Sequence, residues 1–120
     1  MSPKEELAFF GRTWLRGAMT ANEISELAEL TEVGAKPGVR LSMSNELDRL
    51  IGRQSSLASE LKVFGVDATP VRLVAFNKSD DANWSVPWHQ DRVIAVSQKV
   101  DIEGYANWTS KSDYWHCEPP

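Results

Sequence analysis

Hydrophobic positions in the first half of the chain recur at helical spacing between capping signals. Thr20 followed by Glu23 forms a capping-box pattern, so the sequence predicts a helix that begins at Thr20 and ends at Gly34. Its buried stripe is expected to consist of Ile24, Leu27 and Ala28. The glutamates between these positions would then form the solvated side.

Two more helices are expected before residue 66. Ser44 caps the first, which Gly52 interrupts, and its apolar stripe consists of Leu47, Leu50 and Ile51. The second covers residues 56–64 and ends at Gly65. At the N-terminus, residues 7–16 predict a short helix leading into a brief strand at 13–15, and residues 35–42 predict a loop or extended connection.

After Gly65 the pattern changes to β-branched and aromatic residues without a helical stripe. Residues 71–76 form the strongest predicted strand, and their near-continuous apolarity predicts burial on both faces. A polar loop follows at 77–87, then the run "WHQDRVIAV" at 88–96 and a turn region at 101–104. Helices first and strands afterwards predict an α+β fold.

The number of predicted strands points to part of a domain. A jelly roll needs about eight strands, whereas this chain offers three or four and stops on Pro119 and Pro120. We therefore expect residues 1–120 to be a single partial domain, truncated within its sheet. Residues 1–68 would be its mainly helical part and residues 69–120 its first β-strands.

Composition and charge exclude several classes of protein. The chain has 120 residues, 42% of them hydrophobic, and a net charge of −4, which fits one soluble globular domain. Without a basic face, neither nucleic acid nor an anionic membrane is an expected partner. The single cysteine, Cys117, and a charged N-terminus without a signal-type apolar core predict a cytoplasmic location.

The candidate chemistry lies at His89 and Asp91. If a strand begins at "WHQD", side chains two residues apart share a face, so His89 and Asp91 project together while Gln90 points away. An imidazole and a carboxylate are two of the three ligands of the 2-His-1-carboxylate triad that holds Fe(II). Two alternatives remain open: a plain surface His–Asp pair, and a zinc site that adds His116 and Cys117.

Tryptophan is the other unusual feature of the C-terminal half. Two interpretations are equally open, because tryptophans near polar residues line pockets but also fill ordinary cores. The residues concerned are Trp84, Trp88, Trp108 and Trp115.

Several separate elements, in order, resemble the phytanoyl-CoA dioxygenase family of Fe(II)- and 2-oxoglutarate-dependent oxygenases. The N-terminal "FFGRTWLRGAMTANEISEL" is similar to the family's opening strand and capped helix. Further along, "LVAFNK" at 73–78 resembles the family's apolar strand that ends in Asn-Lys, and a polar loop and "WHQD" follow it. The tail "HCEPP" at 116–120 is similar to a later element of bacterial members.

The resemblance implies a double-stranded β-helix, a jelly-roll or cupin-like core with N-terminal helices packed on it. It implies that His89 and Asp91 are iron ligands and that Val74 and Lys78 lie beside 2-oxoglutarate. The family's second histidine ligand and its carboxylate-binding arginine normally follow the "EPP" element, after which this chain stops. His116 falls outside the family's triad and is expected to be a packed or loop-ordering histidine, with Cys117 a buried thiol.

The functional expectation is therefore a dioxygenase that hydroxylates a small molecule, with Fe(II) as cofactor and 2-oxoglutarate as cosubstrate. Because only two of the ligands are present, we expect this chain alone to turn over little. The alternative is a non-catalytic, truncated interaction module of the same fold. Exposed strand edges would lead either form to self-associate.

Overall fold

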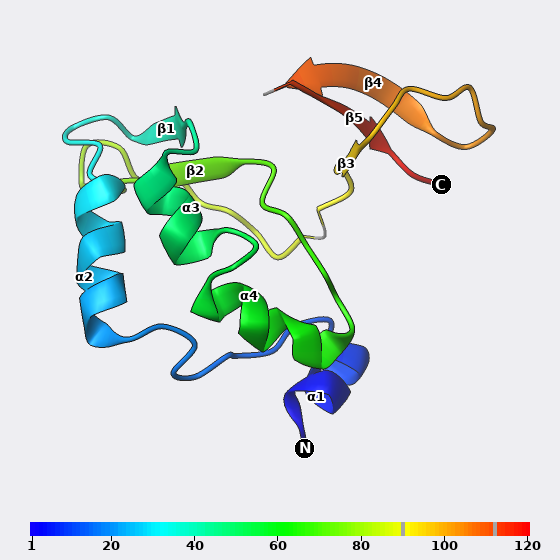
Figure 1. Ribbon diagram of the computed structural model, residues 1–120. Helices are drawn as coiled ribbons and strands as arrows, with labels where there is room; N and C mark the ends of the chain where they lie inside the picture. The colour runs from blue at the N-terminus through cyan, green and yellow to red at the C-terminus, as the bar shows by residue number, and fades with distance from the viewer. Residues whose placement is uncertain (90, 112) are drawn as a thin grey trace. The chain divides into compact units, whose positions relative to one another are not determined.

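The chain consists of two compact units. The computed structural model describes residues 1–89, 91–111 and 113–120, and they divide into unit 1, Met1–Asn77, and unit 2, Lys78–Pro120. Unit 1 contains the helices and a two-stranded sheet, and unit 2 contains a three-stranded sheet (Figure 1). Both sheets are antiparallel. The predicted α+β class is confirmed, and the division between residues 68 and 69 stays a prediction.

Each α-helix of unit 1 begins at a serine or threonine cap. The helices are α1 (Pro3–Phe10), α2 (Ala21–Leu30), α3 (Asn45–Ile51) and α4 (Ser56–Leu61), and a 3-10 turn at Lys62–Phe64 extends α4. In every case the cap hydroxyl accepts a hydrogen bond from the backbone N–H three residues later, which satisfies one of the free donors of the first turn. The cap residues are Ser2, Thr20, Ser44 and Ser55.

The predicted caps at Thr20 and Ser44 are confirmed, but other boundaries differ. The first helix covers residues 3–10 instead of 7–16, because Ser2 and Glu5 form a capping box and Gly11 ends the helix in the left-handed conformation, at φ 70°. The predicted strand at 13–15 is wrong. These residues have no regular structure, and the hydroxyl of Thr13 donates 2.7 Å to the carboxylate of Glu6.

The predicted stripe and end of α2 are also corrected. The helix stops at Leu30 and Thr31 caps it, so Gly34 lies beyond its end. Leu27 is half-buried as expected, whereas Ala28 is exposed and Ile24 is 55% exposed. The side of α2 that faces α3 and α4 makes polar contacts instead. An ion pair joins Glu26 to Arg49 of α3, and the Ser56 hydroxyl of α4 donates 3.1 Å to Glu23.

The small core of unit 1 lies on α3 and at the turn that joins α3 to α4. Leu47 and Leu50 are the side chains that α3 buries, as the apolar spacing predicted. Between the helices, the buried hydroxyl of Ser55 accepts from the Ala58 N–H and donates 2.6 Å to the Gly52 carbonyl. This single hydroxyl therefore satisfies a free carbonyl at the end of α3 and a free N–H at the start of α4.

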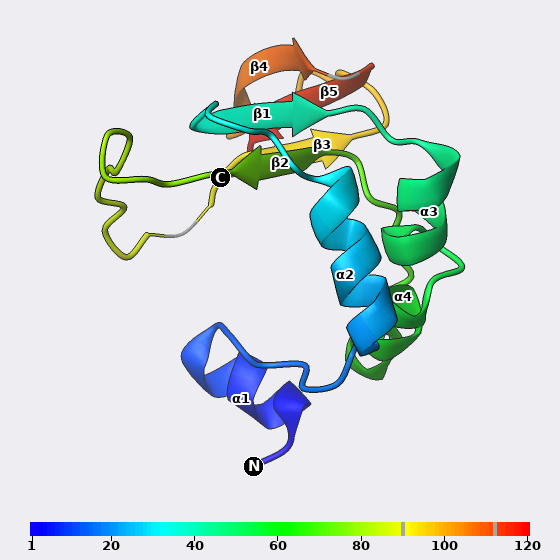
Figure 2. The same cartoon turned by 90° about the vertical axis from the view of Figure 1, so that its left-hand side faces the viewer.

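The sheet of unit 1 pairs two segments that are distant in sequence. Strand β1 (Gly38–Leu41) runs antiparallel to β2 (Leu73–Phe76), and α2 and α3 lie on one side of the pair (Figure 2). Along β2, half-buried residues alternate with exposed ones. The predicted burial on both faces is wrong, because every second residue of β2 is exposed and α2 and α3 lie on one side of this sheet.

Unit 2 is a sheet of three strands with β5 in the middle. The strands are β3 (Ile94–Val96), β4 (Ala106–Lys111) and β5 (Tyr114–Glu118), in the order β3-β5-β4 (Figure 1). The predicted turn at 101–104 is confirmed by a hydrogen bond from the Tyr105 N–H to the Ile102 carbonyl, 3.2 Å long. None of the helices in residues 1–89, 91–111 and 113–120 has the length and apolarity needed to cross a bilayer.

Candidate functional site

The predicted metal ligands lie in the connection that leads into β3. The sequence pattern placed His89 and Asp91 inside a strand, but the strand begins only at Ile94. The strand argument for a shared face is therefore wrong, and the part of it that concerns Gln90 lies outside the described residues. The structure nevertheless brings the two side chains together, with His89 Nε2 3.2 Å from Asp91 Oδ1.

The backbone of Pro87 sets the orientation of the imidazole. His89 Nδ1 lies 2.9 Å from the Pro87 carbonyl oxygen, which can only accept a hydrogen bond. Nδ1 must therefore carry the proton and donate it, which leaves Nε2 as the atom that faces Asp91. Histidines that bind metals usually donate their second ring N–H to a carbonyl or carboxylate in this way.

The separation of the two facing atoms suits a shared cation. Two ligand atoms at right angles around a metal ion, each about 2.1 Å from it, are about 3.0 Å apart. The observed 3.2 Å between Nε2 and Oδ1 is close to this value. Imidazole nitrogen with carboxylate oxygen is also the donor set of non-haem Fe(II) sites, so the residues present fit two adjacent positions of such a centre.

The same arrangement stabilises the protonated imidazole. The pKa of His89 is raised above its ordinary value of 6.5, first by the hydrogen bond to the Pro87 carbonyl and then by the negative charge of Asp91. Both groups are open to solvent, since the side chains are 54% and 92% exposed. A positive charge between Nε2 and Oδ1 is thus favoured, whether a proton or a metal ion carries it.

His116 and Cys117 lie in the middle strand of unit 2. Both are buried, and His116 Nδ1 lies 3.1 Å from the Tyr114 carbonyl, so the expected packed histidine and buried thiol are confirmed. In the part of the chain that the structure describes, no three His, Cys, Asp or Glu side chains are grouped as a metal site. The zinc site of His89, Asp91, His116 and Cys117 has no support in this geometry.

The two predicted cosubstrate residues fall in different units. Val74 lies on β2 of unit 1 and is 36% exposed. Lys78 begins unit 2, where its ammonium donates 2.9 Å to the Trp84 carbonyl and lies 4.6 Å from the centre of the Trp84 ring. Just before it, the Asn77 N–H donates 3.0 Å to the Pro37 carbonyl and so ties down the end of β2.

The tryptophans do not form an ordinary core. Trp88, beside the candidate ligand, is 94% exposed, and Trp84 and Trp115 are each 37% exposed. Trp108 is half-buried and makes an edge-to-face contact with Trp115, with the ring centres 6.4 Å apart.

Two contributors to the site were absent from the sequence prediction. They are the hydrogen bond from His89 to the Pro87 carbonyl and the contact of the Lys78 ammonium with Trp84, a residue that was predicted only as one of the pocket or core tryptophans. The signal for the first is a proline two residues before a histidine, since proline restricts the backbone that carries the carbonyl. Lys78 and Trp84 are six positions apart, and residue spacing does not indicate their contact.

Comparison of the chain with models of protein families, with curated proteins and with solved structures gives no match.

Proposed function

We propose that this chain carries iron ligands of an Fe(II)- and 2-oxoglutarate-dependent dioxygenase of the phytanoyl-CoA dioxygenase type. His89 Nε2 and the Asp91 carboxylate are the two ligands. The proposal rests on one observation: the Pro87 carbonyl fixes the proton on Nδ1 and leaves Nε2 3.2 Å from Asp91 Oδ1. Such a pair of donors is ready to accept a metal ion without a change of rotamer.

The residues around the pair have separate roles in this proposal. Pro87 selects the tautomer of His89, and Asp91 supplies the negative charge that favours a bound cation. Lys78 has ammonium protons beyond the one donated to Trp84, and it offers them to a carboxylate of 2-oxoglutarate. For Val74, a role in the cosubstrate pocket rests on the family resemblance alone. When bound, iron supplies oxygen activation coupled to the oxidation of 2-oxoglutarate, for hydroxylation of a small molecule.

For the fold, we propose a double-stranded β-helix core of the jelly-roll type. The order of elements supports it, because all the strands except β1 follow the capped helices. So do the separate elements of the sequence that resemble the dioxygenase family. The antiparallel pairing in both units is the pairing such a core requires.

Metal binding tests the ligand assignment. Binding of Mn(II), a redox-stable substitute for Fe(II), would be followed by electron paramagnetic resonance of the full chain. We expect His89→Ala and Asp91→Asn each to weaken Mn(II) binding by at least about tenfold. Removing a partner that only hydrogen-bonds to a ligand already costs about tenfold or more in metal affinity, and removing a ligand should cost no less. Asp101→Asn is the matched control, because it removes an exposed carboxylate outside the site.

The outcome separates the dioxygenase from the non-catalytic module. If both substitutions leave Mn(II) binding as it is in the wild type, the metal site is wrong and an interaction module becomes the better account. A second titration adds 2-oxoglutarate with and without Fe(II). The proposal expects tighter 2-oxoglutarate binding with iron present and weaker binding in Lys78→Met. Equal binding in the presence and absence of iron would contradict it.

A further inference from the structure

The turn that follows α4 borders an open hollow on the surface of unit 1. The hollow has a volume of about 360 Å³, and its lining residues are Lys62, Gly65, Val66 and Asp67. All four belong to unit 1. Pockets that hold small organic molecules have volumes from about 300 Å³ upward, so this hollow is large enough for a ligand the size of an amino acid.

Gly65 keeps space open beside the turn. It ends the 3-10 turn in the left-handed conformation, at φ 74°, and its N–H donates 2.9 Å to the Lys62 carbonyl. A Cβ added at Gly65 would meet no heavy atom within 4 Å beyond its chain neighbours. The conformation that favours glycine at this position therefore also leaves room for another molecule.

Two side chains of opposite charge line the hollow. Lys62 and Asp67 are both exposed. They are not paired with each other, since the ion pairs among residues 1–89, 91–111 and 113–120 do not join these two side chains. A ligand in the hollow therefore meets both an ammonium group and a carboxylate that do not neutralise one another.

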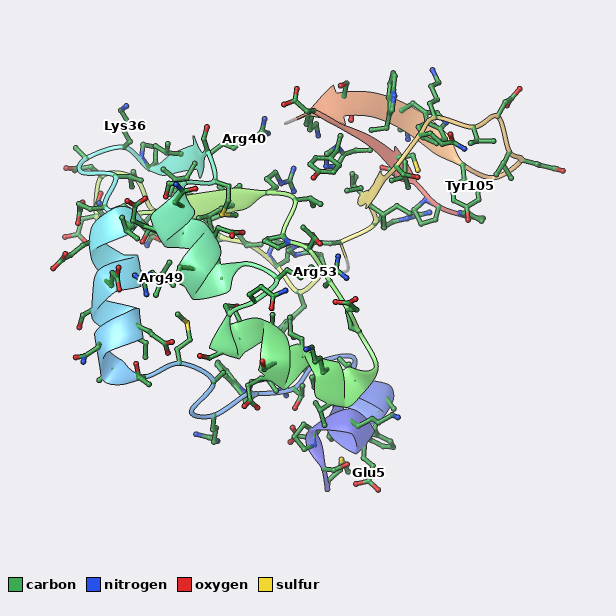
Figure 3. The ribbon with its side chains drawn as sticks, viewed as in Figure 1. Glu5, Lys36, Arg40, Arg49, Arg53 and Tyr105 are labelled. Atoms are coloured by element: carbon green, nitrogen blue, oxygen red, sulfur yellow. The ribbon has the colours of Figure 1, made fainter. Side chains whose placement is uncertain are left out.

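Arg53 positions the carboxylate of Asp67. It lies in the segment between α3 and α4 (Figure 3), and its guanidinium pairs with Oδ2 of Asp67. A carboxylate has about four acceptor sites on its two oxygens, so Asp67 retains the capacity to accept from a second donor. Val66, which is 46% exposed, adds apolar surface next to this carboxylate.

We propose that this hollow binds a zwitterion the size of an amino acid. The Lys62 ammonium donates to the carboxylate of the ligand, the Asp67 carboxylate accepts from its ammonium, and Val66 contacts an apolar side chain. A molecule with only one of the two charges satisfies only one of the two lining groups. This inference goes beyond the proposed function, because it concerns unit 1 alone and needs neither metal nor 2-oxoglutarate.

Leucine is a suitable probe, and two of its derivatives each lack one of its charges. N-acetylleucine keeps the carboxylate and leucinamide keeps the ammonium. Each compound would be titrated into the metal-free, 15N-labelled full chain, and backbone amide shifts would be followed by NMR. We expect leucine to shift the amides of residues 62–67 in a saturable way. Both derivatives should bind about tenfold more weakly, since each loses one hydrogen bond between charged groups.

Two variants assign the charges, and a third is the control. Lys62→Gln should remove the preference for leucine over leucinamide, and Asp67→Asn should remove the preference for leucine over N-acetylleucine. Because both residues are exposed, the circular dichroism of these variants should match that of the wild type. Lys36→Gln is the matched control, because it removes an exposed lysine of unit 1 that does not line the hollow (Figure 3). Its affinity for leucine should equal that of the wild type.

Several results would overturn the proposal. They include the absence of a saturable leucine shift at residues 62–67, equal affinity for leucine and its two derivatives, and preferences that survive in Lys62→Gln and Asp67→Asn. Because no metal is added, each of these results leaves the His89–Asp91 proposal standing. Loss of metal binding at His89 and Asp91 would likewise leave the binding of leucine in unit 1 unchanged.

Discussion

The helical half of unit 1 and the loop that carries His89 and Asp91 are held in different ways. The helices are fixed by cap hydroxyls that bond to the backbone N–H three residues later, by two buried leucines on α3 and by polar contacts from α2 to α3 and α4. The His89–Asp91 pair lies outside regular structure, is exposed, and depends on one carbonyl and one carboxylate. The residues that stabilise the fold and those of the candidate site thus lie in different parts of the chain. Substitutions in one part should leave the property of the other unchanged.

The largest effect on stability should come from the core of α3. Leu50 is 2% exposed, so Leu50→Ala loses its burial and leaves a cavity. We expect the free energy of unfolding to fall by about 2–5 kcal/mol, which would remove much of the helical circular dichroism signal. Ile24→Ala, at an exposed position of α2, is the control and should change stability by about 0.5 kcal/mol or less. Equal losses in the two variants would contradict the described core.

A smaller effect is expected at the end of α3. A Cβ at Gly52 would lie 2.2 Å from the Asp48 carbonyl oxygen, and the backbone would have to move to accept it. Gly52→Ala should therefore reduce the free energy of unfolding by about 1–3 kcal/mol, as overpacked sites do. Urea denaturation followed by circular dichroism measures the loss. Gly34→Ala is an unsuitable control because Gly34 has a positive φ, so the variant should be compared with wild type alone. A stability equal to that of the wild type would show that α3 does not end as described.

The cap of α2 should contribute less again. The Thr20 hydroxyl accepts a hydrogen bond from the Glu23 N–H, 3.2 Å long, and Thr20→Ala leaves that donor to water. The expected loss is about 1 kcal/mol, measured by urea denaturation. Thr20→Ser keeps the acceptor and should retain most of the stability. If serine and alanine behave alike, the hydroxyl is not the stabilising group.

The smallest stability effect should be a pH dependence from the same cap. The pKa of Glu23 lies below its ordinary value of 4.5, chiefly because its carboxylate accepts a hydrogen bond from the Thr20 N–H. A lowered folded-state pKa means that the stabilisation is present above pH 4.5 and is lost as the pH falls through the lower value. Denaturation curves of wild type and Glu23→Gln, recorded from pH 6 downward, should therefore converge. A constant difference would contradict the carboxylate's role.

The sequence predicted the parts of the fold that short-range interactions determine. Caps such as Thr20 and Ser44, and stops such as Gly65, act on residues within one turn, so their effect can be recognised from spacing. Strand pairing depends instead on residues that are far apart in the sequence. Segment 35–42 was predicted only as a loop or extended connection, because its partner, β2, lies more than 30 residues away. Burial along β2 depends on which face the helices cover, and periodicity does not contain that information.

For the candidate site, residue types were easier to predict than geometry. The pair of His89 and Asp91 was found from its spacing, but the strand proposed to align it was wrong, since β3 begins at Ile94. The alignment comes instead from a hydrogen bond to the Pro87 carbonyl, a contact between backbone and side chain that residue spacing does not specify.

His89 should matter for metal binding and not for stability. Since its side chain is exposed and contributes no core contact, His89→Ala should change the free energy of unfolding by about 0.5 kcal/mol or less. The same variant should lose metal affinity. Urea denaturation without metal, together with Mn(II) titration, measures both quantities. A large loss of stability in the metal-free variant would show that the pair is a structural contact.

The most direct test of the central claim is the identity of the ring nitrogen that binds metal. Nitrogen-15 NMR of the assigned His89 ring, with Zn(II) as a diamagnetic substitute for Fe(II), distinguishes Nε2 from Nδ1. The account predicts that added metal changes the Nε2 resonance, that Nδ1 keeps its proton because it donates to the Pro87 carbonyl, and that Asp91→Asn weakens the change. Metal on Nδ1, or a His89 ring that does not respond while metal binds elsewhere, would contradict it.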